Sequence, residues 1–175
     1  MSEIYKLLDN DSIILEVKLT GVSETCDRES LKNNLIETMK EYHGIGLSAN
    51  QCGIMERMFV FYEDFHERKP VACFEPVIVE ASKVEIQMDE GCLTWPGLWL
   101  KVKRPDWVKV HFEDETGHLH ERKYSGLEAR VFQHEMDHME GTDFTKKVSK
   151  LQLDMSKKRR AKQLKKAERL SKQPS

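Results

Sequence analysis

The strongest chemical signal in the sequence is a pair of histidines around an acid, in His134-Glu135-Met136-Asp137-His138. Four residues of an α-helix turn the chain by about 400°, so the two imidazoles differ by only about 40° in direction and lie about 6 Å apart along the axis. Both can therefore reach one metal ion, and Glu135 lies close enough to take a proton from a water on that ion. The spacing predicts a catalytic metal site.

A catalytic metal site needs a third protein ligand and an open position. No histidine follows His138, and Glu140 and Glu168 are poorly placed, so we expect the third ligand upstream. The upstream candidates are the cysteines and the other histidines: Cys26, Cys52, Cys73, Cys92, His43, His66, His111, His118 and His120. Cys92 differs from the rest because it follows a glycine in Glu90-Gly91-Cys92-Leu93-Thr94, where the backbone can approach another group closely.

A third segment, residues 44–51 with the sequence GIGLSANQ, combines two glycines, small residues and an amide. This composition fits a plain turn and strand. It also fits a loop that places its backbone and the Gln51 carboxamide against a substrate. Taken alone, the segment does not separate these two interpretations.

A helix is predicted between Asp27 and Gly44, upstream of this segment. Asp27 is a suitable N-cap, and apolar residues follow at helical spacing, at Leu31, Leu35, Met39 and Tyr42. Gly44 has the residue type expected just after a helix C-terminus. Strands are predicted at 58–62, near 77–79 and 84–86, and at 107–112 and 119–124, with a hairpin turn at 115–117.

The metal motif itself is predicted on a helix. Ser125 and Glu128 fit a capping box at its start, and Gly141 fits its end. The predicted strands cluster between the two helices instead of alternating with them. This order favours the α+β class over a doubly wound α/β fold.

The charge of the chain is divided between two segments. Of the 175 residues 33% are charged, yet the net charge is only −2. Residues 146–175 hold 12 basic and 2 acidic residues, a net +10, so the rest carries −12. A short apolar stripe, Val148, Leu151 and Met155, precedes the basic cluster 157–160. Such asymmetry is typical of a tail that binds a polyanion, and it also fits a solvated helix or a disordered end.

The length predicts one domain with its own core and room for a small appendage. No apolar run approaches the ~18 residues of a membrane helix, so we expect no membrane partner. The first residues lack the apolar segment of a secretory signal, so we expect a cytoplasmic protein without disulfides.

Taken together, the segments GIGLSANQ (44–51), EGCLT (90–94) and QHEMDH (133–138) resemble the motifs of the peptide deformylase family in order and spacing. The resemblance covers residues 28–145. It implies a metal-dependent hydrolase that removes the N-formyl group from the formyl-methionine of newly synthesised polypeptides and releases formate.

The resemblance also implies a role for each matching position. Cys92, His134 and His138 would hold one divalent ion, Fe(II) above all, with zinc or nickel as replacements. Glu135 would act as general base and then general acid. The remaining roles fall to residues that bind substrate: the Gln51 side chain and the Leu93 N–H as oxyanion hole, and Ile45, Gly46 and Val131 around the methionine side chain.

The fold that the resemblance implies has antiparallel sheets around a central helix carrying HExxH. Residues 1–145 would form the catalytic domain. Residues 146–175 would form a basic C-terminal helix or tail, with the ribosome and its RNA as partner.

Several positions depart from the common pattern of the family: Ser48, Asn50, Thr94, Trp99 and Arg130. These differences bear on substrate preference rather than on the reaction. We also expect Glu90 to pair with Arg104 and so to brace the loop that holds Cys92.

Two other functions stay open on the residues alone. A zinc endopeptidase with the same HExxH would take its third ligand from outside EGCL and cleave internal peptide bonds. A nucleic-acid- or ribosome-binding protein with a structural metal would need four protein ligands, and Glu135 would then be dispensable.

Overall fold

The computed structural model describes residues 2–171, so residues 172–175 of the expected tail lie outside the described part. The helices of this part are α1 (Arg28–Glu41), α2 (Gly126–Met139) and α3 (Lys150–Ser171), with 3₁₀ turns η1 (Ile13–Glu16), η2 (Ala49–Cys52) and η3 (Phe144–Lys147). The strands are β1 (Gly46–Ser48), β2 (Met58–Asp64), β3 (Lys69–Ala81), β4 (Glu85–Cys92), β5 (Trp95–Pro105), β6 (Trp107–Glu113) and β7 (Leu119–Ser125).

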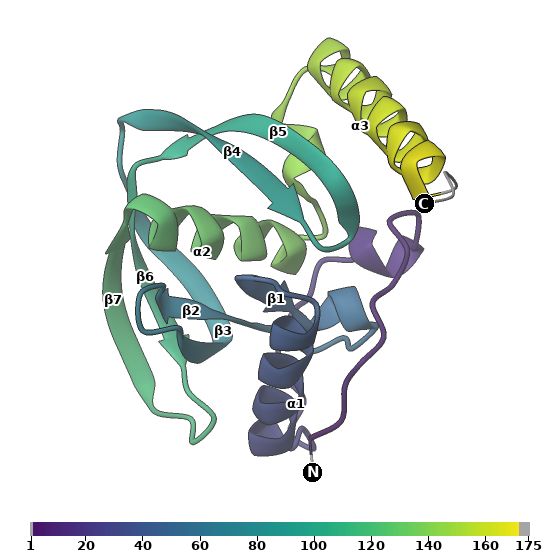
Figure 1. Cartoon of the computed structure of the whole chain (residues 1–175). Helices are drawn as coiled ribbons and strands as arrows, with labels where there is room; N and C mark the ends of the chain where they lie inside the picture. The colour runs from purple at the N-terminus through teal and green to yellow at the C-terminus, as the bar shows by residue number, and fades with distance from the viewer. Residues whose placement is uncertain (1, 172–175) are drawn as a thin grey trace.

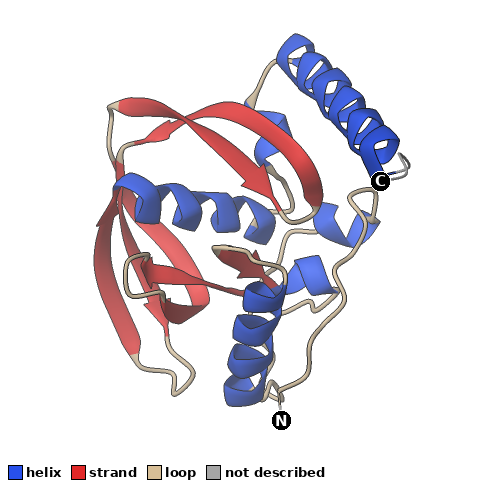
Figure 2. Cartoon of the chain, viewed as in Figure 1, coloured by secondary structure: helices blue, strands red, loops and turns tan. Residues whose placement is uncertain are grey.

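The strands form two separate antiparallel sheets. Five of them pair in the order β1-β2-β3-β6-β7, and β4 pairs with β5 in a long hairpin. Helix α2 runs between the five-stranded sheet and the hairpin, as Figures 1 and 2 show. The expected α+β class, with a central helix between antiparallel sheets, is confirmed.

The hydrophobic core explains why α2 is central. Its apolar residues Phe132 and Met139 are fully buried against the five-stranded sheet, where Phe132 makes edge contacts with Phe59 and Phe61. Every residue from Ala129 to Met139 is buried, including its histidines and acids. Polar groups at such depth must find partners inside the protein, because water cannot satisfy them.

Helix α1 forms as predicted, but its end differs from the expectation. Asp27 is the N-cap and accepts a hydrogen bond from Ser30 N at 3.1 Å. The left-handed residue after the helix is His43 (φ 56°), not Gly44. Gly44 is the second residue after the cap residue Tyr42. Its N–H donates to Met39 O at 2.8 Å, as that position does in a Schellman motif. Gly44 is needed for another reason, since a Cβ there would lie 2.7 Å from Leu93 Cδ1.

Helix α2 also begins where predicted, but without the expected capping box. Ser125 is the N-cap and also the last residue of β7, paired with Trp107, but its side chain makes no capping hydrogen bond. Gly126 (φ 59°) then turns the chain directly into the helix, with its N–H donating to Asp106 O at 3.3 Å. Gly141 (φ 71°) follows the helix end as predicted.

Strand β5 was not predicted, and a strand within residues 44–51 was only one of two interpretations of that segment. The strand β1 has only three residues, and β5 contains Pro96 and Gly97 near its start. The pattern of β5 becomes regular only from Leu98 onward, where Leu98, Leu100 and Val102 are buried and the residues between them are exposed. That buried face packs against Phe144.

The C-terminal helix α3 packs across β5 at its start and extends beyond it (Figure 1). Val148, which precedes the helix, and Leu153 within it pack against the buried face of β5, and Gln152 Nε2 donates to Lys101 O at 2.9 Å. The expected apolar stripe is therefore wrong in part, because the helix turns Leu151 and Met155 outward. None of the helices among residues 2–171 is long and apolar enough to cross a membrane.

Candidate metal centre

Three predicted metal ligands come together between the hairpin and α2. Cys92 stands at the end of β4, and His134 and His138 stand on successive turns of α2. One donor atom from each lies within 4.8 Å of the others, and Cys92 Sγ lies 3.4 Å from His138 Nε2. All four cysteines of the chain are free, so this thiol is available as a ligand.

These residues fit a divalent ion of the catalytic type. One thiolate and two imidazoles are a donor set that Zn²⁺ and other first-row metals accept. Within residues 2–171 the group contains three donors and no fourth, which leaves one coordination position for substrate or water. A closed structural zinc site would need a fourth protein ligand.

The thiol of Cys92 lies in an environment that favours its ionised form. Burial alone would raise the pKa of Cys92, but the charges and hydrogen bonds of His138 and His134 lower it to about 5. Since the thiolate is the form that binds metal, the site presents its sulfur ready for an ion at neutral pH.

The carboxylate of Glu90 organises the ligands from behind. It accepts hydrogen bonds from Arg104 Nε at 2.6 Å and Nη2 at 2.9 Å, and from Arg130 Nη1 at 2.8 Å. Its Oε2 also lies 3.0 Å from His134 Nδ1. Burial would raise the pKa of Glu90, but Arg104 and His134 hold it well below its usual range. The expected pairing of Glu90 with Arg104 is confirmed.

The contact between Glu90 and His134 also fixes which imidazole nitrogen can bind metal. A ring N–H at Nδ1 donates to the carboxylate, which leaves Nε2 as the free donor atom toward Cys92. A carboxylate behind a histidine ligand orients the ring and increases its basicity.

Arg104 and Arg130 also bind groups other than Glu90 and so extend the buried charge network. Arg104 Nη1 lies 2.8 Å from Asp137 Oδ2 on α2, and Asp137 is also paired with Lys147. Arg130 donates to two backbone carbonyls of the hairpin, those of Val102 and Ile86, at 2.9 and 2.8 Å. The network thus joins the hairpin that carries Cys92 to the helix that carries both histidines.

Glu135 lies beside the ligands and has a free oxygen. It is buried, and its Oε2 has no hydrogen-bond partner among the described residues. Burial raises the pKa of Glu135 to about 7, while positive charge on His134 and His138 works in the opposite direction. A carboxylate with such a pKa is suited to exchange protons near neutral pH.

Gln51 is held in one orientation by its neighbours. Its Oε1 accepts from Ser48 N at 2.9 Å, and its Nε2 donates to Thr94 Oγ1 at 2.9 Å. The same Nε2 lies 3.5 Å from Cys92 Sγ. Because the backbone N–H of Ser48 can only donate, it keeps the carboxamide oxygen on its side and turns the NH₂ group toward the ligands.

Asn50 connects this loop to α2. Its Nδ2 donates to the carbonyl oxygen of His138 at 2.9 Å, and its Oδ1 accepts from Ser48 Oγ at 2.8 Å. Three of the positions that depart from the common motif, Ser48, Asn50 and Thr94, therefore belong to one hydrogen-bonded group around Gln51.

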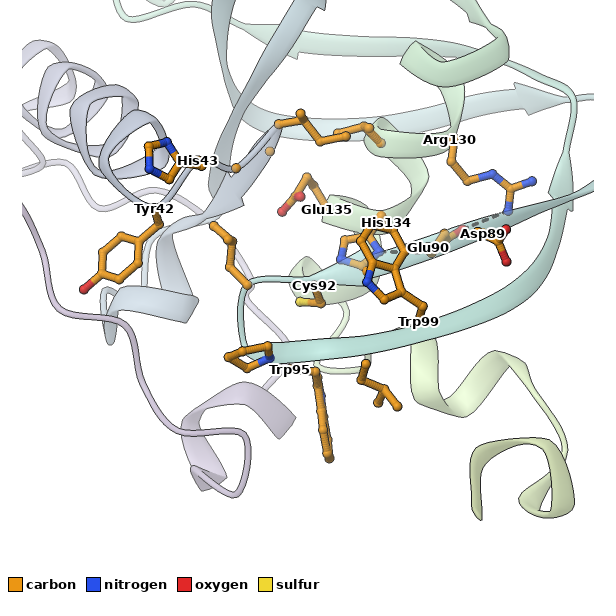
Figure 3. A pocket seen from close by; sticks show the side chains of 18 of the residues that line it. Tyr42, His43, Asp89, Glu90, Cys92, Trp95, Trp99, Arg130, His134 and Glu135 are labelled. Carbon is orange, nitrogen blue, oxygen red and sulfur yellow. Dashed lines mark hydrogen bonds and ion pairs between the residues drawn. The ribbon is translucent and has the colours of Figure 1, made fainter. Parts of the chain in front are cut away.

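The ligands open into a cavity of about 470 Å³, within the range of sites that hold a small ligand. Figure 3 shows Cys92, His134 and Glu135 together in this pocket. The structure brings almost all the sequence-predicted residues into its lining: Ile45, Gly46, Gln51, Cys92, Leu93, Val131, His134 and Glu135. His138 lies behind them, 1% exposed.

Sequence reasoning missed two functional contacts. The pairing of Arg130 with Glu90 and the link from Asn50 to His138 join residues 40 and 88 positions apart. Both residues were noticed only as departures from a motif. Arg130 stands between the apolar residues Ala129 and Val131, and this was the available signal, since a charged residue that is buried with such neighbours must find a partner.

Comparison with known proteins gives a consistent result. The family model described as polypeptide deformylase matches residues 1–154. Peptide deformylase from Prochlorococcus marinus (strain MIT 9312) is 36% identical over 149 residues, which are 84% of this chain and 73% of that protein.

Solved structures agree with this match. Peptide deformylase from Legionella pneumophila has a TM-score of 0.83 at 30% identity and covers 98% of this chain and 99% of its own. The enzyme from Synechococcus elongatus, solved in complex with actinonin, has a TM-score of 0.82 at 31% identity, with 90% and 88% covered.

Removal of one cation from the buried network should destabilise the protein. The Arg104→Met variant leaves the carboxylates of Glu90 and Asp137 short of a partner in a buried site. We expect the free energy of unfolding to fall by about 3–5 kcal/mol, measured by denaturant titration. Metal content after dialysis should fall as well, because Glu90 then holds His134 less firmly.

The matched control is Arg122→Met, which removes a half-exposed arginine paired with Glu63 at 3.4 Å. Exposed ion pairs contribute little, so its unfolding should stay close to that of the wild type. Equal stability and metal content of the Arg104→Met and Arg122→Met proteins would show that the network does not brace the site.

Proposed function

The chain belongs to the polypeptide deformylase family, and we propose that its Cys92, His134 and His138 hold the metal ion with which it removes the N-formyl group from new polypeptides. The observation that carries this assignment is the group of three donors beside a buried carboxylate that has a free oxygen. A divalent ion is supported by the donor set. We propose Fe(II) in the cell, with zinc or nickel as replacements, since a thiolate makes the centre softer than a third imidazole would.

The edges of the two sheets can hold the peptide. Among the described strands, β1 pairs only with β2 and β4 pairs only with β5, so each has one unpaired edge. Residues of both line the pocket. An extended peptide can bind such an edge through its main chain, with side chains entering pockets on alternate sides. We propose that Ile45, Gly46 and Val131 surround the methionine side chain.

The reaction then depends on groups placed around the formyl carbon. When bound, the divalent ion acts as a Lewis acid and activates water as a nucleophile at neutral pH. Glu135 takes the proton of that water at its free carboxylate oxygen. Gln51 Nε2–H and the Leu93 N–H donate to the formyl oxygen as negative charge grows on it; such a donor is typically worth ~2.7–4 kcal/mol. Glu135 finally gives the proton to the leaving amine, and formate and a free methionine N-terminus result.

The basic segment is proposed to bring the enzyme to its substrate. Residues 146–175 would form an appendage of the catalytic domain 1–145, and the outer part of α3 is exposed on all sides. We propose that this part binds ribosomal RNA through phosphate contacts, which supply affinity without sequence preference. The compartment would be the one in which formylated chains are made, which we expect to be the cytoplasm.

Loss of the proton-transfer group should abolish turnover but not metal binding. For Glu135→Gln we expect formate release from formyl-Met-Ala-Ser to fall by roughly 10²–10⁴-fold, because general acid–base catalysis contributes about that factor. Metal analysis of anaerobically purified protein should give one ion per chain in variant and wild type.

Glu128→Gln is the matched control, since Glu128 stands in the first turn of the same helix and outside the pocket lining. It should retain wild-type turnover. A Glu135→Gln protein that releases formate as fast as the wild type would refute the proposed role.

A methyl group on Gly46 should displace the carboxylate of Glu135, because it would collide with it. A Cβ there would lie 2.5 Å from Glu135 Oε1 and 2.8 Å from Val131 Cγ1, so one of them must move. We expect Gly46→Ala to lower kcat about 100-fold, as displacements of about 1 Å can do.

In the control Gly21→Ala the new Cβ meets only the flexible carboxylate end of Glu75, at 3.3 Å, and kcat should not change. Full activity of Gly46→Ala would mean that Glu135 does not need its observed position.

Charge reversal in α3 tests the ribosome proposal without disturbing its contacts with β5. Replacement of Lys165, Lys166 and Arg169 by glutamate should reduce co-sedimentation with ribosomes. The salt dependence of the remaining binding should also be weaker, because fewer phosphates are contacted. Hydrolysis of a free formyl peptide checks that the variant is folded.

A control with the same change of charge replaces three exposed lysines outside α3, Lys6, Lys69 and Lys83. It should sediment with ribosomes more strongly than the α3 variant. If both triple variants bind ribosomes equally, the helix is not the binding element.

A further inference from the structure

An exposed tryptophan stands at the mouth of the pocket. Trp99 is 63% exposed and projects from β5 on the pocket side, near Asp89 and Cys92 in Figure 3. Its ring covers Gly91 of β4, where a Cβ would lie 3.2–3.3 Å from three of the ring atoms. The close backbone beneath holds the ring on one side, while the rest of the indole stays open to solvent.

Trp99 has exposed apolar neighbours in the same lining. Tyr42 and Leu127 also border the cavity and are 38–39% exposed. They come from different parts of the chain, the end of α1 and the start of α2. Single exposed apolar residues are ordinary, but a group of them around one cavity marks a surface that binds something apolar.

The pocket proposed for the methionine side chain does not account for the exposed apolar residues at the entrance of the cavity. The residues proposed to surround the methionine side chain account for the interior, next to Glu135 and the ligands. A peptide that continues outward along the β4 edge must pass Gly91, on which the Trp99 ring lies. The side chains of the next residues therefore meet this mouth, on alternate sides of the extended chain.

We propose that Trp99 is a specificity-determining residue whose indole binds a large apolar or aromatic side chain at the second or third position of the substrate. This inference rests on the deformylase function and specifies its substrate class. Aromatic rings pack on one another in offset or edge-to-face geometry, and a rigid indole gives up little freedom when it does so. Small or acidic side chains at that position gain nothing from the ring.

Competition kinetics tests the proposal. The kcat/KM for formyl-Met-Phe-Ser and for formyl-Met-Ser-Phe is divided by that for formyl-Met-Ser-Ser. In the wild type at least one of the two ratios should be roughly threefold to tenfold. Trp99→Ala should bring that ratio close to one, and Trp99→Phe should restore most of it.

The control is Leu119→Ala, which removes another exposed apolar side chain, 62% exposed on β7 and outside the pocket lining. It should keep the wild-type ratio. A further peptide carries lysine in place of the phenylalanine. If its kcat/KM exceeds that of the phenylalanine peptide, the proposal is overturned, because charge would then govern the choice. Ratios near one in the wild type, or a ratio that persists in Trp99→Ala, would overturn it as well.

A second measurement does not depend on turnover. The product peptide Met-Phe-Ser, or Met-Ser-Phe if that position is the preferred one, is titrated into the metal-loaded enzyme while tryptophan emission is recorded. The wild type should show an emission change that Met-Ser-Ser does not give and that Trp99→Phe lacks. Loss of formate release from every peptide would contradict the deformylase function, whereas equal release from all of them contradicts only the role of Trp99.

Discussion

A buried carboxylate shared by two arginines and a histidine is the interaction on which the site depends. Glu90 lies on the hairpin, two residues before Cys92, and its cationic partner Arg130 lies on α2 with His134. One charged group therefore sets the strand ligand and the helix ligands relative to each other. Such a network is costly if any member is lost, because a buried charge without a partner is far less stable than a paired one. The same property makes it a rigid frame for a metal site.

The rest of the fold keeps this frame in place and leaves one side open. The five-stranded sheet buries the apolar side of α2, the hairpin covers its polar side, and Asn50 joins the loop of Gln51 to the carbonyl of His138. Groups that act on substrate are thus anchored to the same helix as the ligands. Gly44 and Gly46 allow the loop to come close, since side chains there would collide with Leu93 and Glu135. The near-neutral net charge is the sum of an acidic segment 1–145, which contains the site, and a basic segment 146–175.

Much of the site could be predicted from sequence because its chemistry lies in short local motifs. The spacing of His134 and His138 required a helix, and the helix is there. Cys92 was one candidate among nine until the family motif selected it. The contacts that brace the ligands were harder, since Arg130 and Asn50 act on residues distant in sequence. Strand β5 was missed and β1 stayed one of two interpretations of its segment, because a three-residue strand and one opening with proline and glycine have no clear periodicity. The capping box at Ser125 fitted the sequence pattern, but Ser125 makes no capping hydrogen bond and Gly126, with φ 59°, turns the chain into the helix.

Metal affinity tests most directly whether Glu90 organises the ligands. Cobalt(II) is titrated into metal-free wild-type protein and into the nearly isosteric Glu90→Gln variant, with absorption recorded in the thiolate charge-transfer region and circular dichroism as a check of folding. We predict one cobalt ion per wild-type chain, with a thiolate charge-transfer band. The folded variant should bind cobalt with about 10–100-fold lower affinity, which is the typical cost of losing a group hydrogen-bonded to a metal ligand. Equal affinity and the same spectrum in both proteins would contradict the account.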